Sequence, residues 1–151
     1  MKPTFRRATR ADAGAATAVI AAAYAPWRIK LPDLPDVTAD VASEIEHGIA
    51  WVAELGGRIV GVVIARRTEA AVHIANLAVA PDAGGHGIGS ALVRTVEDAA
   101  HQDGVSVLQL ATHARMDRNV TFYERLGWKV SSQQGNKILM ERRLPSRGEA
   151  S

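Results

Sequence analysis

The chain of 151 residues is predicted to fold as an α/β domain, with a mixed β-sheet that carries helices on both faces. Two observations predict this class. Runs rich in valine and isoleucine alternate with segments whose apolar residues recur at helical spacing, and two of these runs flank the hairpin turn sequence Gly56-Gly57. The hydrophobic fraction of 47% is ordinary for a globular protein. We therefore expect residues 1–145 to form one domain, followed by a disordered tail at 146–151.

The first third of the chain is predicted to hold one strand and two helices. Residues 4–9 are typical of a strand, and Thr9 and Asp12 have capping-box spacing before an alanine-rich helix over 13–24. Three prolines in residues 25–36 argue against a regular helix there. A second amphipathic helix is indicated by apolar residues at every fourth position, namely Val37, Val41, Ile45 and Ile49.

Strands dominate the rest of the chain. The hairpin is expected over residues 50–67, and a further strand over 71–80 ends at Pro81. A third helix follows a glycine-rich loop and is expected to stop near Gly104. Its core face carries Ile88, Leu92, Val96 and Ala99. The remaining elements are a strand at 105–112, a short helix at 117–127 and a strand pair at 128–132 and 136–144.

Composition excludes several classes of protein. The 18 basic and 16 acidic residues leave a net charge of only +2, which is too small to indicate a nucleic-acid partner. There is no cysteine, and the five histidines form no close ligand spacing such as HExxH, so we expect no disulfide and no metal site. No apolar run is long enough to span a membrane, and the N-terminal residues lack a signal-peptide core. These features predict a soluble, cytoplasmic protein that has no membrane contact.

Residues 81–92, PDAGGHGIGSAL, place four glycines between a strand and a helix. This arrangement is typical of an anion site, because glycine lets the backbone N–H groups at a helix start approach a phosphate. A Walker A loop is excluded, since Gly89 is followed by Ser90-Ala91 rather than by Lys and then Ser or Thr. A dinucleotide-binding fingerprint is weak, because Ser90 takes the place of its third glycine and no acidic residue follows at the needed distance. An ordinary flexible turn is the alternative.

Two segments together resemble the GCN5-related N-acetyltransferase (GNAT) superfamily. Residues 77–93, LAVAPDAGGHGIGSALV, are similar to its acyl-CoA-binding motif, in which a strand ending in V-x-P precedes Arg/Gln-x-x-Gly-x-Gly/Ala and a helix. Residues 119–130, NVTFYERLGWKV, resemble its second signature, an aromatic-Tyr-x-x-x-Gly-aromatic helix and turn. The order of elements agrees with the family over residues 4–144. The resemblance implies a mostly antiparallel, twisted sheet of the acyl-CoA N-acyltransferase fold and an acetyl-CoA-dependent N-acetyltransferase activity.

The resemblance also implies how acetyl-CoA is bound. A bulged strand end holds the pantetheine arm and steadies the acyl oxygen with a backbone amide, and the residues there are Leu77, Ala78 and Val79. Loop amides and a helix N-terminus hold the pyrophosphate, and this group is Gly84, Gly85, His86, Gly87, Ile88, Gly89 and Ser90.

Two positions depart from the family pattern. Gly84 stands where the family usually has Arg or Gln, so that one side-chain contact to phosphate is missing. His86 is then either a partial substitute or a solvent-exposed side chain. Met116 replaces a frequent cofactor-contacting Asn, and Asn119, one turn along, is either a cofactor contact or a helix-surface residue.

The resemblance implies a general acid but leaves the general base open. Tyr123 matches the family's tyrosine beside the thioester sulfur, so we expect it to act as the general acid, with a packing role as the alternative. The base is not evident, because the positions where relatives often carry Glu hold Asn76 and apolar residues. Asn76 could hold a water that carries the proton away, and His73 or His113 could act directly. Otherwise the amine arrives neutral, or bulk water suffices.

The acceptor site of such folds lies under the first two helices and their connecting loop. Candidate substrate-binding residues there are Tyr24, Trp27 and Arg28, although Trp27 could equally pin the proline-rich loop to the core. Arg28 and Lys30 suggest an acidic group on the substrate, whereas Asp33 and Asp36 suggest a cationic one. We expect a small-molecule amine, an amino acid or a peptide as the acceptor. An acyl-CoA sensor or scaffold with little turnover is the alternative, and the resemblance also allows a homodimer.

Overall fold

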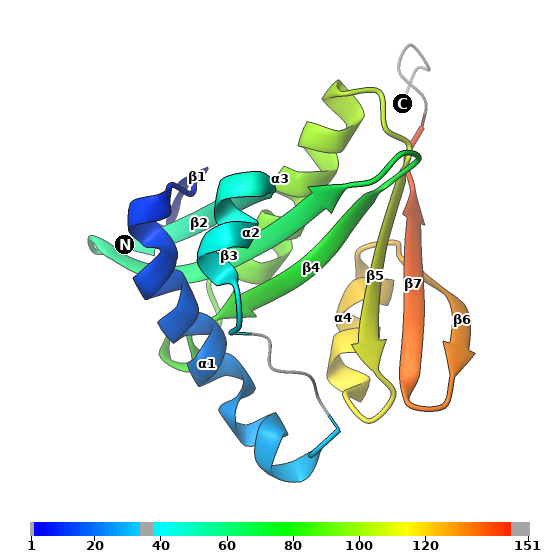
Figure 1. Ribbon diagram of the computed structural model, residues 1–151, viewed down its shortest axis with the longest axis horizontal. Helices are drawn as coiled ribbons and strands as arrows, with labels where there is room; N and C mark the ends of the chain where they lie inside the picture. Colours follow the sequence, from blue (N-terminus) through cyan, green and yellow to red (C-terminus); the bar gives the residue numbers. More distant parts are fainter. Residues whose placement is uncertain (1, 34–37, 146–151) are drawn as a thin grey trace.

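The computed structural model describes residues 2–33 and 38–145, and within them seven strands form one sheet in the order β1-β2-β3-β4-β5-β7-β6 (Figure 1). The strands are β1 (Thr4–Arg7), β2 (Ile49–Leu55), β3 (Arg58–Arg67), β4 (Val72–Val79), β5 (Val107–His113), β6 (Lys129–Gln134) and β7 (Lys137–Arg143). The helices are α1 (Ala13–Lys30), α2 (Val41–His47), α3 (Ile88–Gln102) and α4 (Asp117–Arg125). Two short 3₁₀ turns, η1 (Arg10–Asp12) and η2 (Pro81–Ala83), precede α1 and α3.

The sheet is mixed, as the sequence predicts, and mostly antiparallel. The exception is the β4–β5 pair, which is parallel and has only three ladder pairs, at Val72–Leu108, His73–Gln109 and Ile74–Leu110. Beyond Ile74 the two strands separate, and Figure 1 shows the two halves of the sheet diverging into a wedge. The wedge leaves one edge of the second half of β4 without a partner strand in the described part of the chain.

Helices cover both faces of the first half of the sheet, so the core has two parts. On one face, α1 and α2 bury Ala16, Ile20, Val41 and Ile45 against β2, β3 and β4. On the other, α3 buries apolar side chains such as Leu92 and Val96 in a larger cluster that also contains Tyr123 of α4. The predicted hairpin is confirmed, since Gly56 and Gly57 join β2 and β3 with φ of +61° and +78°.

A bulge in β4 exchanges the two faces of the strand. Ile64 pairs with Asn76 while Ala65 pairs with Ile74, which leaves Ala75 as an extra residue. As a result Ile74 packs in the α3 cluster, whereas Ala78 packs under α1 and α2. Without the bulge these even-numbered residues would share one face. The bulge therefore turns Asn76 toward the α1 side, directly at the point where β4 and β5 part.

Two predicted boundaries are wrong. Helix α1 does not stop before the proline-rich segment but continues through Pro26 to Lys30. The ring is tolerated because Pro26 and Ala22, whose carbonyl loses its partner, both lie on the exposed side of the helix. The helix is then anchored by Leu31, which is buried and donates its N–H to the Trp27 carbonyl at 2.7 Å.

The second helix is shorter than predicted. It spans Val41–His47, and Ile49 begins β2 instead of continuing the helical stripe. Gly48 permits the change, because it lies so close to β3 and to the end of α2 that a Cβ would be 2.6 Å from the carbonyl oxygen of Ala65 and 2.7 Å from that of Glu44. Val37, Asp36 and the tail at 146–151 lie outside the described residues. Within those residues, no helix has the length and apolar character that a membrane crossing requires.

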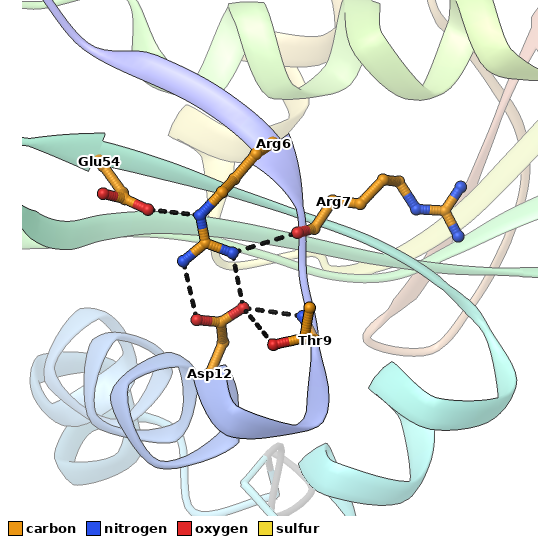
Figure 2. Close-up of polar contacts among 5 residues, drawn as sticks. All are labelled: Arg6, Arg7, Thr9, Asp12 and Glu54. Carbon is orange, nitrogen blue, oxygen red and sulfur yellow. Dashed lines mark hydrogen bonds and ion pairs between the residues drawn. The ribbon is translucent and has the colours of Figure 1, made fainter.

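The predicted capping box is confirmed and extended by an ion pair. The Thr9 N–H donates to Oδ2 of Asp12 at 2.7 Å (Figure 2). The Arg6 guanidinium donates to both oxygens of this carboxylate, at 2.8 and 2.9 Å. Arg6 also binds Glu54 of β2. Asp12 is 7% exposed, and the Arg6 hydrogen bonds hold its pKa well below the usual range. This network ties β1 and β2 to the start of α1.

Candidate active site

Three adjoining cavities follow the wedge between β4 and β5. A cavity of about 600 Å³ lies at the mouth, one of about 70 Å³ lies deeper beside Tyr123, and one of about 220 Å³ leads to the first turn of α3. Tyr24 of α1 lines all three. The first and second share Ala75, and the second and third share Leu77 and Phe122. Together they form one continuous cleft, which we call the wedge cleft.

The β4 wall of the wedge cleft presents backbone as well as side chains. The Ala80 N–H donates to the Val60 carbonyl at 2.8 Å, which directs that residue's backbone groups toward β3. Because antiparallel strands bond through alternate residues, Ala78 also points its backbone groups at β3. Leu77 and Val79 point theirs the other way, into the wedge. Of the three predicted backbone contributors, these two therefore offer free groups to a ligand, while Ala78 contributes to the wall.

The glycine loop leads into the cavity nearest α3. Gly85 and Gly87 have φ of +85° and +68°, a region that other residues rarely adopt, and Gly87 is the N-cap of α3. The first main-chain bond of the helix joins the Ala91 N–H to the Gly87 carbonyl at 3.1 Å, which leaves the N–H groups of the preceding residues without helical partners. Gly89 lies close enough to Phe122 that a Cβ would be 3.4 Å from its Cζ. The start of α3 is thus held directly against α4.

The other predicted loop residues are less enclosed. Gly84 and His86 are exposed, and Ser90 is half-buried in the first turn of α3. Ile88 is 2% exposed and packs directly against Gly61 of β3, where an added Cβ would lie only 2.7 Å from the Ile88 side chain. This contact fixes the start of α3. The structure therefore brings this backbone to the end of the wedge cleft and leaves the His86 ring in solvent.

Tyr123 lies inside the wedge cleft, on the inner face of α4. Its side chain is 6% exposed and packs edge-on against Phe122 and at a tilt against Trp128, with centroid distances of 5.0 and 5.4 Å. The turn after α4 holds it in place, since the N–H groups of Leu126 and Trp128 both donate to its carbonyl at 3.0 Å. Burial raises the pKa of the Tyr123 phenol, and the neighbouring Tyr24 raises it further. The phenol is thus neutral at physiological pH.

Asn76 and Asn119 lie on opposite walls of the same small cavity. Asn76 is 5% exposed on β4, and Asn119 donates from its amide to the Thr112 hydroxyl at 3.4 Å. Met116, at the position of the family's usual Asn, is buried and lines the two larger cavities. Each of these side chains therefore reaches the wedge cleft.

The mouth of the wedge cleft contains a polar cluster that joins distant segments. The Nε2 atom of His113 lies 3.0 Å from Oδ2 of Asp33, and the Asn136 side-chain amide donates to the same oxygen at 3.2 Å. The Arg115 N–H donates to Nδ1 of His113 at 3.1 Å, so the proton of the neutral ring lies on Nε2 and is donated to Asp33. The His113 hydrogen bond holds the pKa of Asp33 below its ordinary value.

Sequence reasoning missed Asn136 as part of this site. It lies in the β6–β7 turn, 103 positions from Asp33, and no local pattern marks it. His73 also lines the mouth, together with Lys137. Burial lowers the pKa of His73 below its ordinary value, and the charges of Arg66 and Lys137 lower it further.

The predicted acceptor residues divide into two groups. Tyr24 and Trp27 line the wedge cleft, whereas Arg28 is exposed and lines none of its three cavities. Lys30 lies over the Trp27 ring, 5.9 Å from its centroid. In the described residues, no cluster of three or more His, Cys, Asp or Glu side chains is suited to hold a metal ion.

Comparison with known proteins decides the family. The sequence model of the acetyltransferase (GNAT) family matches residues 17–128, which is well over half of the chain. The chain belongs to the GNAT acetyltransferase family. The GNAT match includes the wedge strands β4 and β5, the glycine loop and α4.

Curated relatives of this GNAT chain carry acetyltransferase names. N-acetyltransferase 8 of Mus musculus is 33% identical over 113 residues, which are 71% of this chain and 49% of the mouse protein. The probable N-acetyltransferase camello of Xenopus laevis is 36% identical over 84 residues, 54% of this chain and 38% of the frog protein. The chain spans about half the length, or less, of these relatives.

Solved structures share the GNAT fold at low identity. The PaiA N-acetyltransferase of Thermoplasma acidophilum, crystallised with coenzyme A, has a TM-score of 0.85 at 16% identity, with 95% of this chain and 99% of that chain covered. The ribosomal-protein-S18-alanine N-acetyltransferase of Escherichia coli has a TM-score of 0.80 at 22% identity, with 97% of each chain covered. These neighbours confirm the predicted fold.

Proposed function

We propose that this GNAT chain transfers the acetyl group of acetyl-CoA to a primary amine of a small molecule, amino acid or peptide. One observation carries the proposal: a free strand edge, a helix N-terminus and a buried phenol converge on the wedge cleft. Bound acetyl-CoA supplies a thioester, so that a C–N bond to the acceptor forms as the C–S bond breaks. The rest of the chemistry falls to side chains and backbone groups of this chain.

The wedge cleft fits the elongated shape and the polarity of acetyl-CoA. The backbone groups of Leu77 and Val79 that face the wedge match the amides of a pantetheine arm, and apolar side chains such as Phe122 line the same path. At the α3 end, the unpartnered N–H groups of the first helical turn suit the pyrophosphate. A side chain at Gly85 or Gly87 would strain this backbone, because both have positive φ.

Leu77 is the candidate for stabilising the acyl oxygen. Its N–H points into the wedge beside the cavity that Tyr123 lines, and the hydrogen-bonded pairing of the next residue, Ala78, with Val62 of β3 holds this part of β4 in place. A fixed N–H donor costs no reorganisation as negative charge develops on the oxygen. Tyr123 is the candidate general acid, since its neutral phenol can donate a proton to the departing thiolate.

The geometry at the cleft mouth favours His73 over His113 as acceptor of the amine proton. Both ring nitrogens of His113 are engaged, one by a backbone N–H and the other by Asp33. His73 is half-buried and neutral at physiological pH, since burial, Arg66 and Lys137 all lower its pKa. Asn76 lies deeper and is the candidate to hold a water between the amine and this histidine.

An amine panel with acetyl-CoA tests the proposal. Release of the CoA thiol can be read with a thiol reagent, because the chain has no cysteine of its own to react. We expect release that depends on one class of amine, with a product heavier by one acetyl group in mass spectrometry. Acetyl-CoA binding without release for any amino acid, diamine or peptide would favour the sensor alternative, and absence of binding would overturn both.

A further inference from the structure

A hollow of about 480 Å³ lies beside the wedge cleft, on the outer side of α4. It is lined by Ser90 of α3 and by α4 and its end, namely Asp117, Arg118, Thr121, Phe122, Arg125 and Leu126. Arg118, Thr121, Phe122 and Arg125 are spaced as i, i+3, i+4 and i+7, so they form one face of the helix. Phe122 also lines two cavities of the wedge cleft. The hollow therefore continues the cleft past the start of α3.

The guanidinium groups of Arg118 and Arg125 both border the hollow and both lack a carboxylate partner in the described part of the chain. Neither side chain makes a hydrogen bond or ion pair with another residue in the described ranges, 2–33 and 38–145. A carboxylate pairs with each of Arg6, Arg58, Arg67, Arg142 and Arg143. Other exposed arginines, such as Arg10 and Arg28, also lack a carboxylate partner among the described residues, but Arg118 and Arg125 are the two that line this hollow. Two such guanidinium groups on one helix face beside a hollow are suited to an anion, because a planar fork of donors matches phosphate oxygens.

The loop itself supplies no such charge. Gly84 has no side chain, and the exposed His86 is the one titratable side chain between Gly84 and Ser90. A CoA molecule carries a 3′-phosphate on its adenosine in addition to the pyrophosphate. If the loop amides receive the pyrophosphate, the hollow beside Ser90 and Phe122 lies next to that site and has room for the adenosine beyond it.

We propose that Arg118 and Arg125 bind the 3′-phosphate of CoA, so that α4 provides the cationic contact that the loop lacks. This inference rests on the proposed function. The two Cα atoms are about 10 Å apart along the helix, a span that two arginine side chains can bridge by converging on one phosphate. Thr121 lies between them on the same face and can add a hydroxyl donor. Asp117 lines the same hollow one residue before Arg118, and its carboxylate opposes an anion at the N-terminal end.

Calorimetry with two ligands tests this assignment. CoA and 3′-dephospho-CoA differ only in the 3′-phosphate, so the ratio of their dissociation constants isolates that group. For the unmodified chain we expect CoA to bind roughly tenfold more tightly, as two exposed charge-assisted contacts allow. The variant Arg118→Ala/Arg125→Ala should bind both ligands equally, with its affinity for 3′-dephospho-CoA unchanged. Asp117→Asn should tighten CoA binding alone.

Arg10→Ala is the matched control, because it removes one exposed arginine of η1 that lines none of the cavities described above. We expect it to keep the full ratio. Equal binding of the two ligands by the unmodified chain would overturn the assignment. So would an equal loss for both ligands in the double variant, which would point to the pyrophosphate or to a structural role. If neither ligand binds the unmodified chain, the proposed function itself fails.

Discussion

Replacement of Asp12 by Asn tests the network that joins β1 and β2 to α1. Asn has the same shape, but its amide group would face the Arg6 guanidinium as a second donor, so at least one of the bonds at 2.8 and 2.9 Å is lost. Breaking a buried ion pair costs about 3–5 kcal/mol, and a single hydrogen bond to a charged group contributes about 1.5–3 kcal/mol. In the variant Arg6 still pairs with Glu54, and its side chain is half-exposed. We therefore expect the free energy of unfolding to fall by about 2 kcal/mol, as for one hydrogen bond to a charged group rather than for a buried ion pair.

Urea and thermal denaturation measure this loss. For a chain of this size, about 2 kcal/mol lowers Tm by about 4–8 °C. Asp82→Asn is the matched control, since Asp82 pairs with Arg58 at 3.2 Å but both side chains are more than half exposed. That control should change stability by less than about 0.5 kcal/mol.

The pH dependence of the Asp12 contribution has a definite sign. The folded state holds the Asp12 pKa below its unfolded value. The carboxylate therefore contributes full stability above the unfolded pKa, and the contribution is lost as pH falls through the folded value. The gap in stability between the native chain and Asp12→Asn should be constant near neutral pH and should shrink in acid. A loss no larger than that of Asp82→Asn, or a gap that persists in acid, would refute the reasoning.

Three further predictions concern the wedge cleft. Tyr123→Phe should lower kcat at least about 100-fold while the dissociation constant of CoA changes less than twofold, and an unchanged kcat would remove Tyr123 from the acid role. Gly87→Asp should abolish CoA binding in calorimetry, because it combines strain at φ of +68° with repulsion of phosphate, and retained affinity would show that the loop is not the cradle. His73→Gln should remove the rise of kcat/KM with pH, whose midpoint in the native chain lies below the ordinary histidine value because the pKa of His73 is lowered. An identical pH profile for that variant would assign the proton transfer elsewhere.

The elements predicted correctly are those whose signals are local. The Gly56-Gly57 turn, the stripe from Ile88 to Val96 and the short helix before Gly127 each depend on a few consecutive residues. The two wrong predictions concern the ends of α1 and α2, and tertiary contacts determine where these helices end. Pro26 continues α1 because the bond that it removes faces solvent and Leu31 anchors the end of the helix. Ile49 leaves the helical stripe because Gly48 packs against the backbone of β3.

The family followed from the sequence by itself, and so did the proposal of where the acyl donor binds. The glycine loop and the Tyr123 segment are contiguous motifs, and contiguous motifs keep their geometry because neighbouring backbone atoms are covalently constrained. The sequence also indicated Tyr24 and Trp27, which line the wedge cleft, although it grouped them with Arg28, which does not.

Only the tertiary structure decided how the walls of the cleft are built. The bulge at Ala75 set the face of Asn76, and the alternation of strand bonds chose Leu77 and Val79 as the residues whose backbone groups face the wedge. Asp33, His113 and Asn136 meet across 80 and 103 positions of sequence. Arg118 and Arg125 gain a candidate role only because α4 packs beside the start of α3. Such contacts depend on how the sheet twists and separates, and no short stretch of sequence encodes that geometry.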